Sequence, residues 1–208
     1  MTVQDVLEQQ EIEEVVHFTT NVGALGTLAD RRLLSRAKLP TQKHLVNVYP
    51  PNARIRYDTF HLDYVNLSVS RINRSFFDAS SNWHRNEDVW WCVLSFDPEI
   101  ATHDGVQFAT TNNRYSGCQR AADGEGLEAL FARRIHQYED RWVTRSETSP
   151  RRWPTCRQAE ILYPGAVSTE HLRGIYVVND AHHDVAAGWC ELVGHDNVPV
   201  EVRPAVFE

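Results

Sequence analysis

Glu160 is the residue whose type and surroundings most strongly suggest chemistry. It is the one acidic side chain in the stretch RQAEILYPGAVS, residues 157–168, and it comes directly before the apolar pair Ile161 and Leu162. A carboxylate set into an apolar strand is costly unless its charge is paired, exposed or used. The residues alone leave two interpretations open: a strand-end carboxylate that pairs with Arg157, or a carboxylate that takes part in a reaction.

A carboxylate held in a partly dry cleft can do two kinds of chemistry. It can stabilise an oxocarbenium-like transition state, as in glycoside hydrolysis, because its attraction grows as positive charge develops on the sugar carbon. It can also serve as a general base, since apolar neighbours raise the pKa of a carboxyl group toward the working range. Glu160 is the candidate for both roles.

The common cofactor and hydrolase motifs are absent from the sequence. There is no Gly-x-Gly-x-x-Gly, no phosphate loop of the Gly-Lys-Ser type, no Gly-x-Ser-x-Gly and no His-Glu-x-x-His. His182 and His183 stand next to Asp184 but have no partner at a metal-ligand spacing, which favours a solvated turn over a metal site. We therefore expect no bound metal.

Composition indicates an ordinary folded chain. Its 208 residues, with 42% hydrophobic and 24% charged residues, predict one domain over residues 1–208. The four cysteines include no Cys-x-x-Cys pair, so neither a disulfide framework nor a zinc module is indicated, and reduced thiols are typical of a cytoplasmic protein. No signal peptide, membrane span or heptad seam is evident, so we expect a cytoplasmic monomer with no membrane association.

Charge is unevenly distributed along the chain. The net charge of -7 speaks against a protein that coats nucleic acid nonspecifically. The segment between Arg114 and Arg157 is nevertheless locally positive, with Tyr115, Tyr138, Trp142 and Trp153 interleaved among its arginines. Arginine with aromatic residues suits a single strand whose bases can stack. A solvated helix and loop of mixed charge would have the same composition.

Hydrophobic patterning predicts about seven short strands and two or three helices. The strands are expected at residues 14–20, 63–70, 89–96, 106–110, 159–164, 172–178 and 198–204, and helices at 21–34 and 127–135. Residues 36–62 and 140–157 are expected to be irregular. Because the strands follow one another too closely for helical crossovers, the predicted fold is α+β with mainly antiparallel central sheets.

Three sequence blocks, in order, resemble those of the DarT-type DNA ADP-ribosyltransferases, the toxins of the DarT–DarG systems. His17-Phe18-Thr19 followed by Leu33-Leu34 is similar to the family's "H-[IF]-T … LL" opening. Asp63-Tyr64-Val65 resembles its "DYV" strand, and Gln158-Ala159-Glu160-Ile161-Leu162 with Leu172 to Val177 resembles its "QAE-[FVI]-L … I-x-x-I-x-V" block. The resemblance runs from about residue 14 to the last strand.

The resemblance implies a single-domain ADP-ribosyltransferase-like fold and an activity that uses NAD+ as the donor of ADP-ribose. Glu160 is then the catalytic carboxylate. His17 and Thr19 correspond to positions that hold the nicotinamide ribose and its amide. Tyr64 is assigned to the same cofactor site, and Asn21, expected to cap the following helix, is placed facing the cofactor.

Arginines complete the expected site. The family uses a catalytic arginine upstream of the "DYV" strand, for which Arg56 and Arg54 are the candidates, with Arg56 preferred because Ile55 and Tyr57 flank it. Arg71 and Arg74, after that strand, are expected to contact the phosphates of NAD+ or of DNA, as bidentate guanidinium donors do.

The resemblance also implies an acceptor and a partner. Residues 112–157 are expected to be the insertion that recognises the acceptor, and the residues expected to bind nucleic acid are Arg114, Tyr115, Arg152, Trp153 and Arg157. The predicted acceptor is thymine or guanine in single-stranded DNA, and the predicted partner is a macrodomain antitoxin of the DarG type. The alternatives are an acceptor in RNA or protein, or a non-catalytic module that binds NAD+ or nucleic acid.

Overall fold

The computed structural model describes residues 1–39, 61–83 and 88–208 of the chain. Its α-helices are α1 (Val3–Gln9), α2 (Asn21–Ala29), α5 (Arg74–Trp83), α6 (Gly124–Ala129) and α7 (Asp180–Val193). Its strands are β1 (Val15–Thr20), β2 (Arg32–Leu34), β3 (Tyr64–Val69), β4 (Trp91–Phe96), β5 (Gln107–Ala109), β6 (Arg120–Ala121), β7 (Arg134–Tyr138), β8 (Arg141–Thr144), β9 (Glu160–Pro164), β10 (Ala166–Ser168), β11 (Leu172–Val177) and β12 (Val200–Val202). Short 3-10 turns cover Arg36–Lys38, Pro98–Thr102, Thr169–His171 and Pro204–Phe207.

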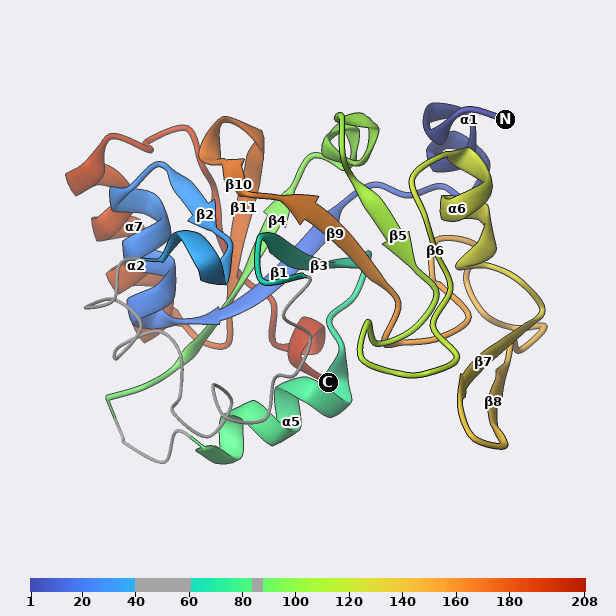
Figure 1. Cartoon of the computed structure of the whole chain (residues 1–208). Coiled ribbons are helices and arrows are strands. Elements are labelled where there is room, and N and C mark those ends of the chain that lie inside the picture. Colours follow the sequence, from blue (N-terminus) through green and yellow to red (C-terminus); the bar gives the residue numbers. More distant parts are fainter. Residues whose placement is uncertain (40–60, 84–87) are drawn as a thin grey trace.

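One large sheet organises the described residues (Figure 1). Its eight strands run in the order β12-β11-β4-β1-β3-β9-β5-β6, and β2 with β10 and β7 with β8 form two smaller antiparallel pairs. Neighbours in the large sheet are antiparallel except β11 and β12. The α+β fold with a mainly antiparallel sheet, predicted from closely spaced strands, is confirmed.

Both faces of the sheet are covered, which explains why its central strands are apolar nearly throughout. On β4, Leu94 and Phe96 pack into the main core, whereas Val93, directly before them, packs into a second cluster with Tyr176 and Phe207. Residues that alternate along a strand point to opposite faces, so a strand buried on both sides has apolar residues at every position. The stretch 89–96 was expected to be such a strand.

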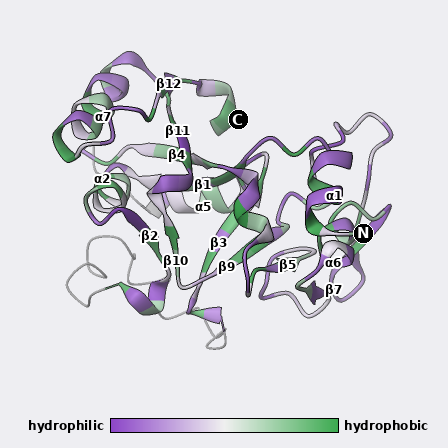
Figure 2. Cartoon of the chain, turned by 90° about the horizontal axis from the view of Figure 1, so that it is seen from above, coloured by the Kyte–Doolittle hydropathy of each residue, from purple (hydrophilic) through white to green (hydrophobic). Residues whose placement is uncertain are grey.

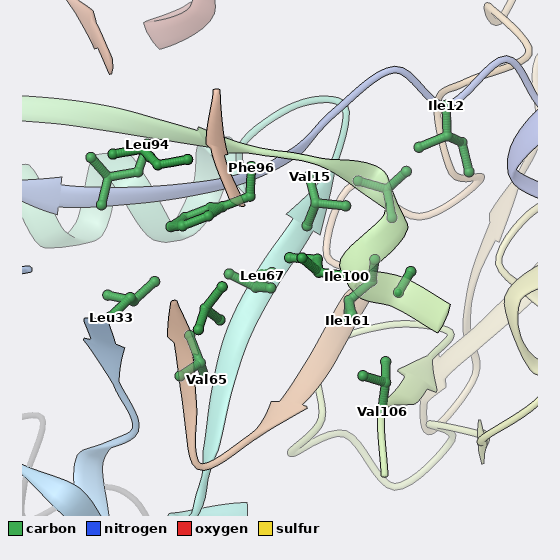
Figure 3. Packing of buried hydrophobic residues seen from close by; sticks show 14 of the residues in the cluster. Ile12, Val15, Leu33, Val65, Leu67, Leu94, Phe96, Ile100, Val106 and Ile161 are labelled. Atoms are coloured by element: carbon green, nitrogen blue, oxygen red, sulfur yellow. The ribbon is translucent and has the colours of Figure 1, made fainter. Parts of the chain in front are cut away.

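The main core joins strands that lie far apart in the sequence. In Figure 3, Val15, Leu67 and Ile161 of three neighbouring strands point toward Ile100, and each is no more than 1% exposed. Helices close the ends of the molecule: α2 and α7 lie at one end, and α1 and α6 lie together at the other (Figure 2). The sheet between them is therefore a rigid support for side chains on its strands.

Two predicted helices are shorter than expected. The helix expected over residues 21–34 ends at Ala29, because Arg31 takes a left-handed conformation (φ 53°) and the chain turns back as β2. Leu33 then pairs with Val167 of β10 and is buried there. Its apolar character comes from strand pairing across a long sequence separation, which helical spacing cannot distinguish from a helix face.

The second correction concerns the helix expected over residues 127–135. The helix α6 ends at Ala129, and Ile135 is a buried residue of β7. Residues 140–157, expected to be irregular, contain β8, which pairs with β7. His182, His183 and Asp184, expected in a turn, lie in the first turn and a half of α7.

Candidate active site

A pocket of about 260 Å³ opens where β1 and β3 separate. These strands pair only at Val15–Val69 and Val16–Ser68, whereas β1 stays paired with β4 through to Thr20. Its walls come from β1, α2, β2, the turn Arg36–Lys38, β3, α5, the first residue of β4 and the first residue of β9. The polar residues among them include His17, Thr19, Thr20, Asp30, Arg32, Arg36, Tyr64, Asn66 and Glu160. The loss of pairing between two adjacent strands thus creates the cavity.

His17 is fixed by a main-chain group on the far side of this gap. Its Nδ1 lies 2.9 Å from the carbonyl oxygen of Asn66 on β3. A carbonyl can only accept a hydrogen bond, so Nδ1 donates and carries the proton. The main-chain hydrogen bonds between β1 and β3 end at Val16, and this side-chain contact bridges the two strands beyond that point. It holds the imidazole against one wall of the pocket.

The N-terminus of α2 forms another wall. Thr20 is the N-cap, and its hydroxyl accepts a hydrogen bond from the amide of Gly23 at 3.2 Å. Asn21, expected to be the cap, is instead the first helical residue. Its side chain donates to the carbonyl of Asp88, and it is not among the pocket residues. The amides at the start of a helix carry partial positive charge, which favours an anionic group in this part of the pocket.

Gly23 is required by a close approach. A Cβ atom at this position would overlap Thr19 Oγ1 and would lie 3.4 Å from Thr20 Oγ1. The hydroxyl of Thr19 therefore occupies the space that a side chain at position 23 would take. This packing directs the threonine of β1 into the pocket, and no feature of the sequence by itself pointed to Gly23.

Glu160 begins β9, between β3 and β5. Its neighbour in the sheet is Ala109, and the following residues Ile161 and Leu162 are fully buried. Glu160 itself is half-buried and lines the pocket, so the apolar strand anchors the main chain while the carboxylate reaches the cavity. Its Oε2 accepts a hydrogen bond from the main-chain amide of Asn113 at 2.8 Å.

Asn113 is held in turn by Arg120 on β6. The guanidinium of Arg120 donates both to the side-chain oxygen and to the carbonyl oxygen of Asn113. Asn113 is itself buried, so the loop between β5 and β6 presents its amide to Glu160 from a constrained position. Sequence reasoning missed both residues because the contact depends on the pairing of β5 with β6 and β9.

Arg71 and Arg74 do not line the pocket. The Arg71 guanidinium lies 4.3 Å from the ring centroid of Trp153 and donates to the carbonyl of Pro154. Burial, together with the nearby positive charge of Arg157, lowers the pKa of Arg71 to about 10, so it remains cationic at neutral pH. Arg74 forms an ion pair with Asp78 at 2.6 Å.

The arginines that do line the pocket are Arg32 and Arg36. They follow α2, and the signal that could have revealed them is the turn back of the chain at Arg31, which places β2 beside β10. Arg54 and Arg56, the expected catalytic arginines, lie outside the described residues. Arg32 was expected near the end of a helix and Arg36 in an irregular segment, so neither was a site candidate.

The residues expected to bind nucleic acid lie along the segment after β5. Arg114, Arg152 and Arg157 are exposed, and Tyr115 packs edge-on against Tyr138 with ring centroids 4.7 Å apart. Trp153 is covered by Arg71. None of these residues lines the pocket itself, but Asn112–Arg114 follow one another beside Glu160, so this surface begins at the pocket.

Within residues 1–39, 61–83 and 88–208, no group of three or more His, Cys, Asp or Glu side chains is placed to hold a metal ion. His182 instead stacks on Trp90, with the two ring centroids 4.3 Å apart. No helix in that part of the chain has the length and apolar character needed to cross a bilayer.

The fold is shared with solved structures of low sequence identity. Thermus sp. 2.9 DarT in complex with carba-NAD+ is 14% identical, with a TM-score of 0.66 over 95% of this chain and 99% of that one. The same Thermus protein in complex with ADP-ribosylated ssDNA is 15% identical, with a TM-score of 0.66 over 95% of this chain and 97% of that one. Thermosipho africanus DarTG in complex with ADP-ribose is 16% identical, with a TM-score of 0.63; the match covers 94% of this chain but 51% of that one, so this chain spans about half its length.

These likenesses show that this chain has the fold of the solved DarT structures. A search of curated proteins found no match. The family model described as "ssDNA thymidine ADP-ribosyltransferase, DarT" matches residues 13–208. The chain therefore belongs to the DarT family.

Proposed function

We propose that this protein transfers ADP-ribose from NAD+ to thymidine in single-stranded DNA. The observation that carries the proposal is that His17, Thr19 and Glu160, which come from β1 and β9, line one pocket. The family description names thymidine as the acceptor, which selects between the two bases that the sequence left open. A family member that was solved with ADP-ribosylated ssDNA shares the fold.

NAD+ binds with its nicotinamide riboside between β1 and β3. His17, with its tautomer fixed by Asn66, and the Thr19 hydroxyl contact the ribose and the amide, and Tyr64 closes the same wall. The N-terminus of α2 and the cationic Arg32 and Arg36 suit the pyrophosphate, because they offer amide donors and positive charge. The donor set of the pocket thus fits a dinucleotide.

Glu160 acts on both reactants. As the bond between nicotinamide and ribose breaks, its electron pair leaves with the pyridine ring and positive charge develops on the ribose carbon, where the carboxylate stabilises it. A ring nitrogen of the base then forms the new bond to that carbon. Its proton is accepted by Glu160, so charge and atoms balance. Arg56, or Arg54 in its place, is proposed to assist from the segment before β3.

The acceptor strand lies along the surface that begins beside Glu160. The candidate contacts are Arg114, Tyr115, Arg152, Trp153 and Arg157, with guanidinium groups for phosphates and aromatic rings for bases. Residues 112–157 form the acceptor-recognition segment of one domain that spans residues 1–208. Arg71, stacked on Trp153, stabilises this segment and contributes positive charge to it, whereas Arg74 is engaged by Asp78.

The remaining parts of the proposal concern the setting of the activity. The protein is a toxin that acts as a monomer on DNA in the cytoplasm, with a macrodomain protein of the DarG type as its antitoxin. Thermosipho africanus DarTG, which shares the fold, supports that pairing.

Incubation with NAD+ and short oligonucleotides, followed by mass measurement, tests the proposal. We expect one ADP-ribose adduct on thymine-containing single strands and none on the duplex. Glu160→Gln preserves size and should lower transfer by about two orders of magnitude, since an electrostatic contact with the transition state is lost. An adduct only on RNA or on protein from a lysate, or full activity of Glu160→Gln, would contradict the assignment.

A further inference from the structure

The hairpin formed by β7 and β8 has two faces of different chemistry. Its inner face carries Ile135 and Gln137, which are 4% and 6% exposed. Its outer face carries Arg134, His136 and Trp142, and Trp142 is 46% exposed. The hairpin lies apart from the large sheet (Figure 1), so the outer face is not needed to build the core.

The outer face is organised around Trp142. The His136 ring stacks against the indole with centroids 4.6 Å apart and an interplanar angle of 28°, and the Arg134 guanidinium lies 4.4 Å from the indole centroid. These contacts restrict the orientation of a large aromatic ring that still exposes almost half of its surface. An oriented and exposed indole costs little entropy when a planar ligand stacks on it.

Arginines lie on the hairpin and next to it. Arg134 of β7 contacts the Trp142 ring, Arg141 of β8 donates to the Tyr138 hydroxyl at 3.0 Å, and the exposed Arg133 directly precedes β7. The acidic Glu139 and Asp140 occupy the turn. Since the chain as a whole carries a net charge of -7, a locally cationic and aromatic surface is an exception that fits a polyanion with planar groups.

The hairpin is connected to the catalytic carboxylate through the loop between β5 and β6. The amide of Asn113 donates to Glu160, and two residues later Tyr115 packs against Tyr138 of β7. The amide of Gly117 in the same loop donates to the carbonyl of Gln137 at 2.9 Å. A strand that leaves the pocket over this loop therefore reaches the hairpin directly.

The inner face fixes the hairpin relative to the site. The Gln137 side chain donates to Cys156 Sγ at 3.3 Å and approaches Thr111 Oγ1 at 3.5 Å. Thr111 lies just after β5 and Cys156 just before β9, the two strands that meet at Glu160. The outer face is thus held at a set position with respect to the carboxylate.

We propose that the outer face of the β7–β8 hairpin is a second contact site for single-stranded DNA, distinct from the nucleotides that flank the modified base. Trp142 stacks on a base several nucleotides along the strand, and Arg134 and Arg141 hold the adjacent phosphates. This inference rests on the proposed function, because the strand must also reach Glu160. It predicts that the length of the acceptor, and not only its reactive base, determines affinity.

A length series tests the inference. For Trp142→Ala we expect the Kd and the KM for an oligonucleotide of about 16 nucleotides to rise about tenfold, whereas values for one of about four nucleotides stay unchanged, because only the longer strand reaches the hairpin. Trp142→Phe should retain most of the affinity. Arg134→Gln and Arg141→Gln should each reduce the slope of log Kd against log salt by about 0.7 on the long strand only. Hydrolysis of NAD+ without DNA should stay at the level of the unmodified protein.

Leu192→Ala is the matched control, since Leu192 is 80% exposed on α7, in a different part of the molecule. Equal losses on short and long strands, or no loss on the long strand, overturn the inference even if transfer to DNA is observed. Length-dependent binding without any transfer by the unmodified protein would instead contradict the proposed function and leave the hairpin as a DNA site. Anisotropy of labelled oligonucleotides measures the binding independently of the reaction.

Discussion

Replacement of Gly23 by alanine should weaken the binding of NAD+ at the N-terminus of α2 without destabilising the helix. The new Cβ would overlap Thr19 Oγ1, whereas Thr19 Cβ, at 3.4 Å, is only at the close end of normal contact. The overlap is relieved if the threonine hydroxyl rotates away. The expected consequence is that the helix survives and the pocket loses one directed hydroxyl.

The magnitudes of the two effects on stability nearly cancel. Alanine in place of glycine stabilises a helix by up to about 1 kcal/mol, and an unfavourable rotamer of Thr19 costs about 0.5–1.5 kcal/mol. The Tm of Gly23→Ala should therefore stay within about 2 °C of the unmodified protein. The loss of one hydrogen bond to the cofactor, worth about 1 kcal/mol, should raise the KM for NAD+ about fivefold.

Gly188→Ala provides the control. Gly188 is an exposed residue of α7, and a Cβ there would have nothing within 4 Å, so the same substitution should raise Tm by about 2–4 °C with an unchanged KM. Thr19→Val should reproduce the KM increase, and addition of Gly23→Ala to it should cause no further rise. Thermal unfolding and initial rates of transfer measure both quantities. If Gly23→Ala raises Tm as much as the control does and leaves the KM for NAD+ unchanged, the Thr19 hydroxyl does not hydrogen-bond the cofactor.

Two further predictions concern the support of Glu160 and a buried thiol. Arg120→Leu removes both hydrogen bonds by which Arg120 clamps Asn113. It should lower kcat about tenfold and leave the KM for NAD+ within about twofold, as measured by steady-state transfer. A change confined to KM would contradict a role for this clamp in catalysis. Burial raises the pKa of the Cys92 thiol to about 12 from its ordinary 9.0, so the unfolded chain ionises first as pH rises. The stability that comes from the neutral thiol is complete below about pH 9 and is lost toward pH 12. Urea unfolding at about pH 8 and about pH 10.5 should therefore show a larger loss for the unmodified protein than for Cys92→Ala.

The pocket of the DarT-type site forms because β1 and β3 separate. Val16 is the last residue of β1 paired with β3, and from there the two strands diverge around the pocket. Polar residues of β3, such as Tyr64 and Asn66, then line the cavity, while Val65 and Leu67, which alternate with them, are buried. The same strand thus contributes apolar residues to the core and polar residues to the pocket.

Local patterning predicted the strands of the large sheet except the two-residue strand β6, which has no pattern of its own. The alternation of Val65, Leu67 and Val69 predicts β3, and the continuous apolar run at residues 89–96 predicts β4, because the burial of these positions follows from strand geometry alone. Glu160 was predicted as a candidate from its apolar neighbours and from the three resembling blocks. These features depend on residues close together in the sequence.

Tertiary structure decided what depends on distant segments. Leu33 and Ile135 have the spacing of helix residues, yet each is buried by a strand partner that only the folded chain brings beside it. The clamp of Arg120 on Asn113, and through it the hydrogen bond to Glu160, likewise requires β5, β6 and β9 to pair in register. The sequence by itself determined which residue types could do the chemistry. The pairing of distant strands determined which of them meet, because contacts between segments far apart in the chain are not encoded in any local period.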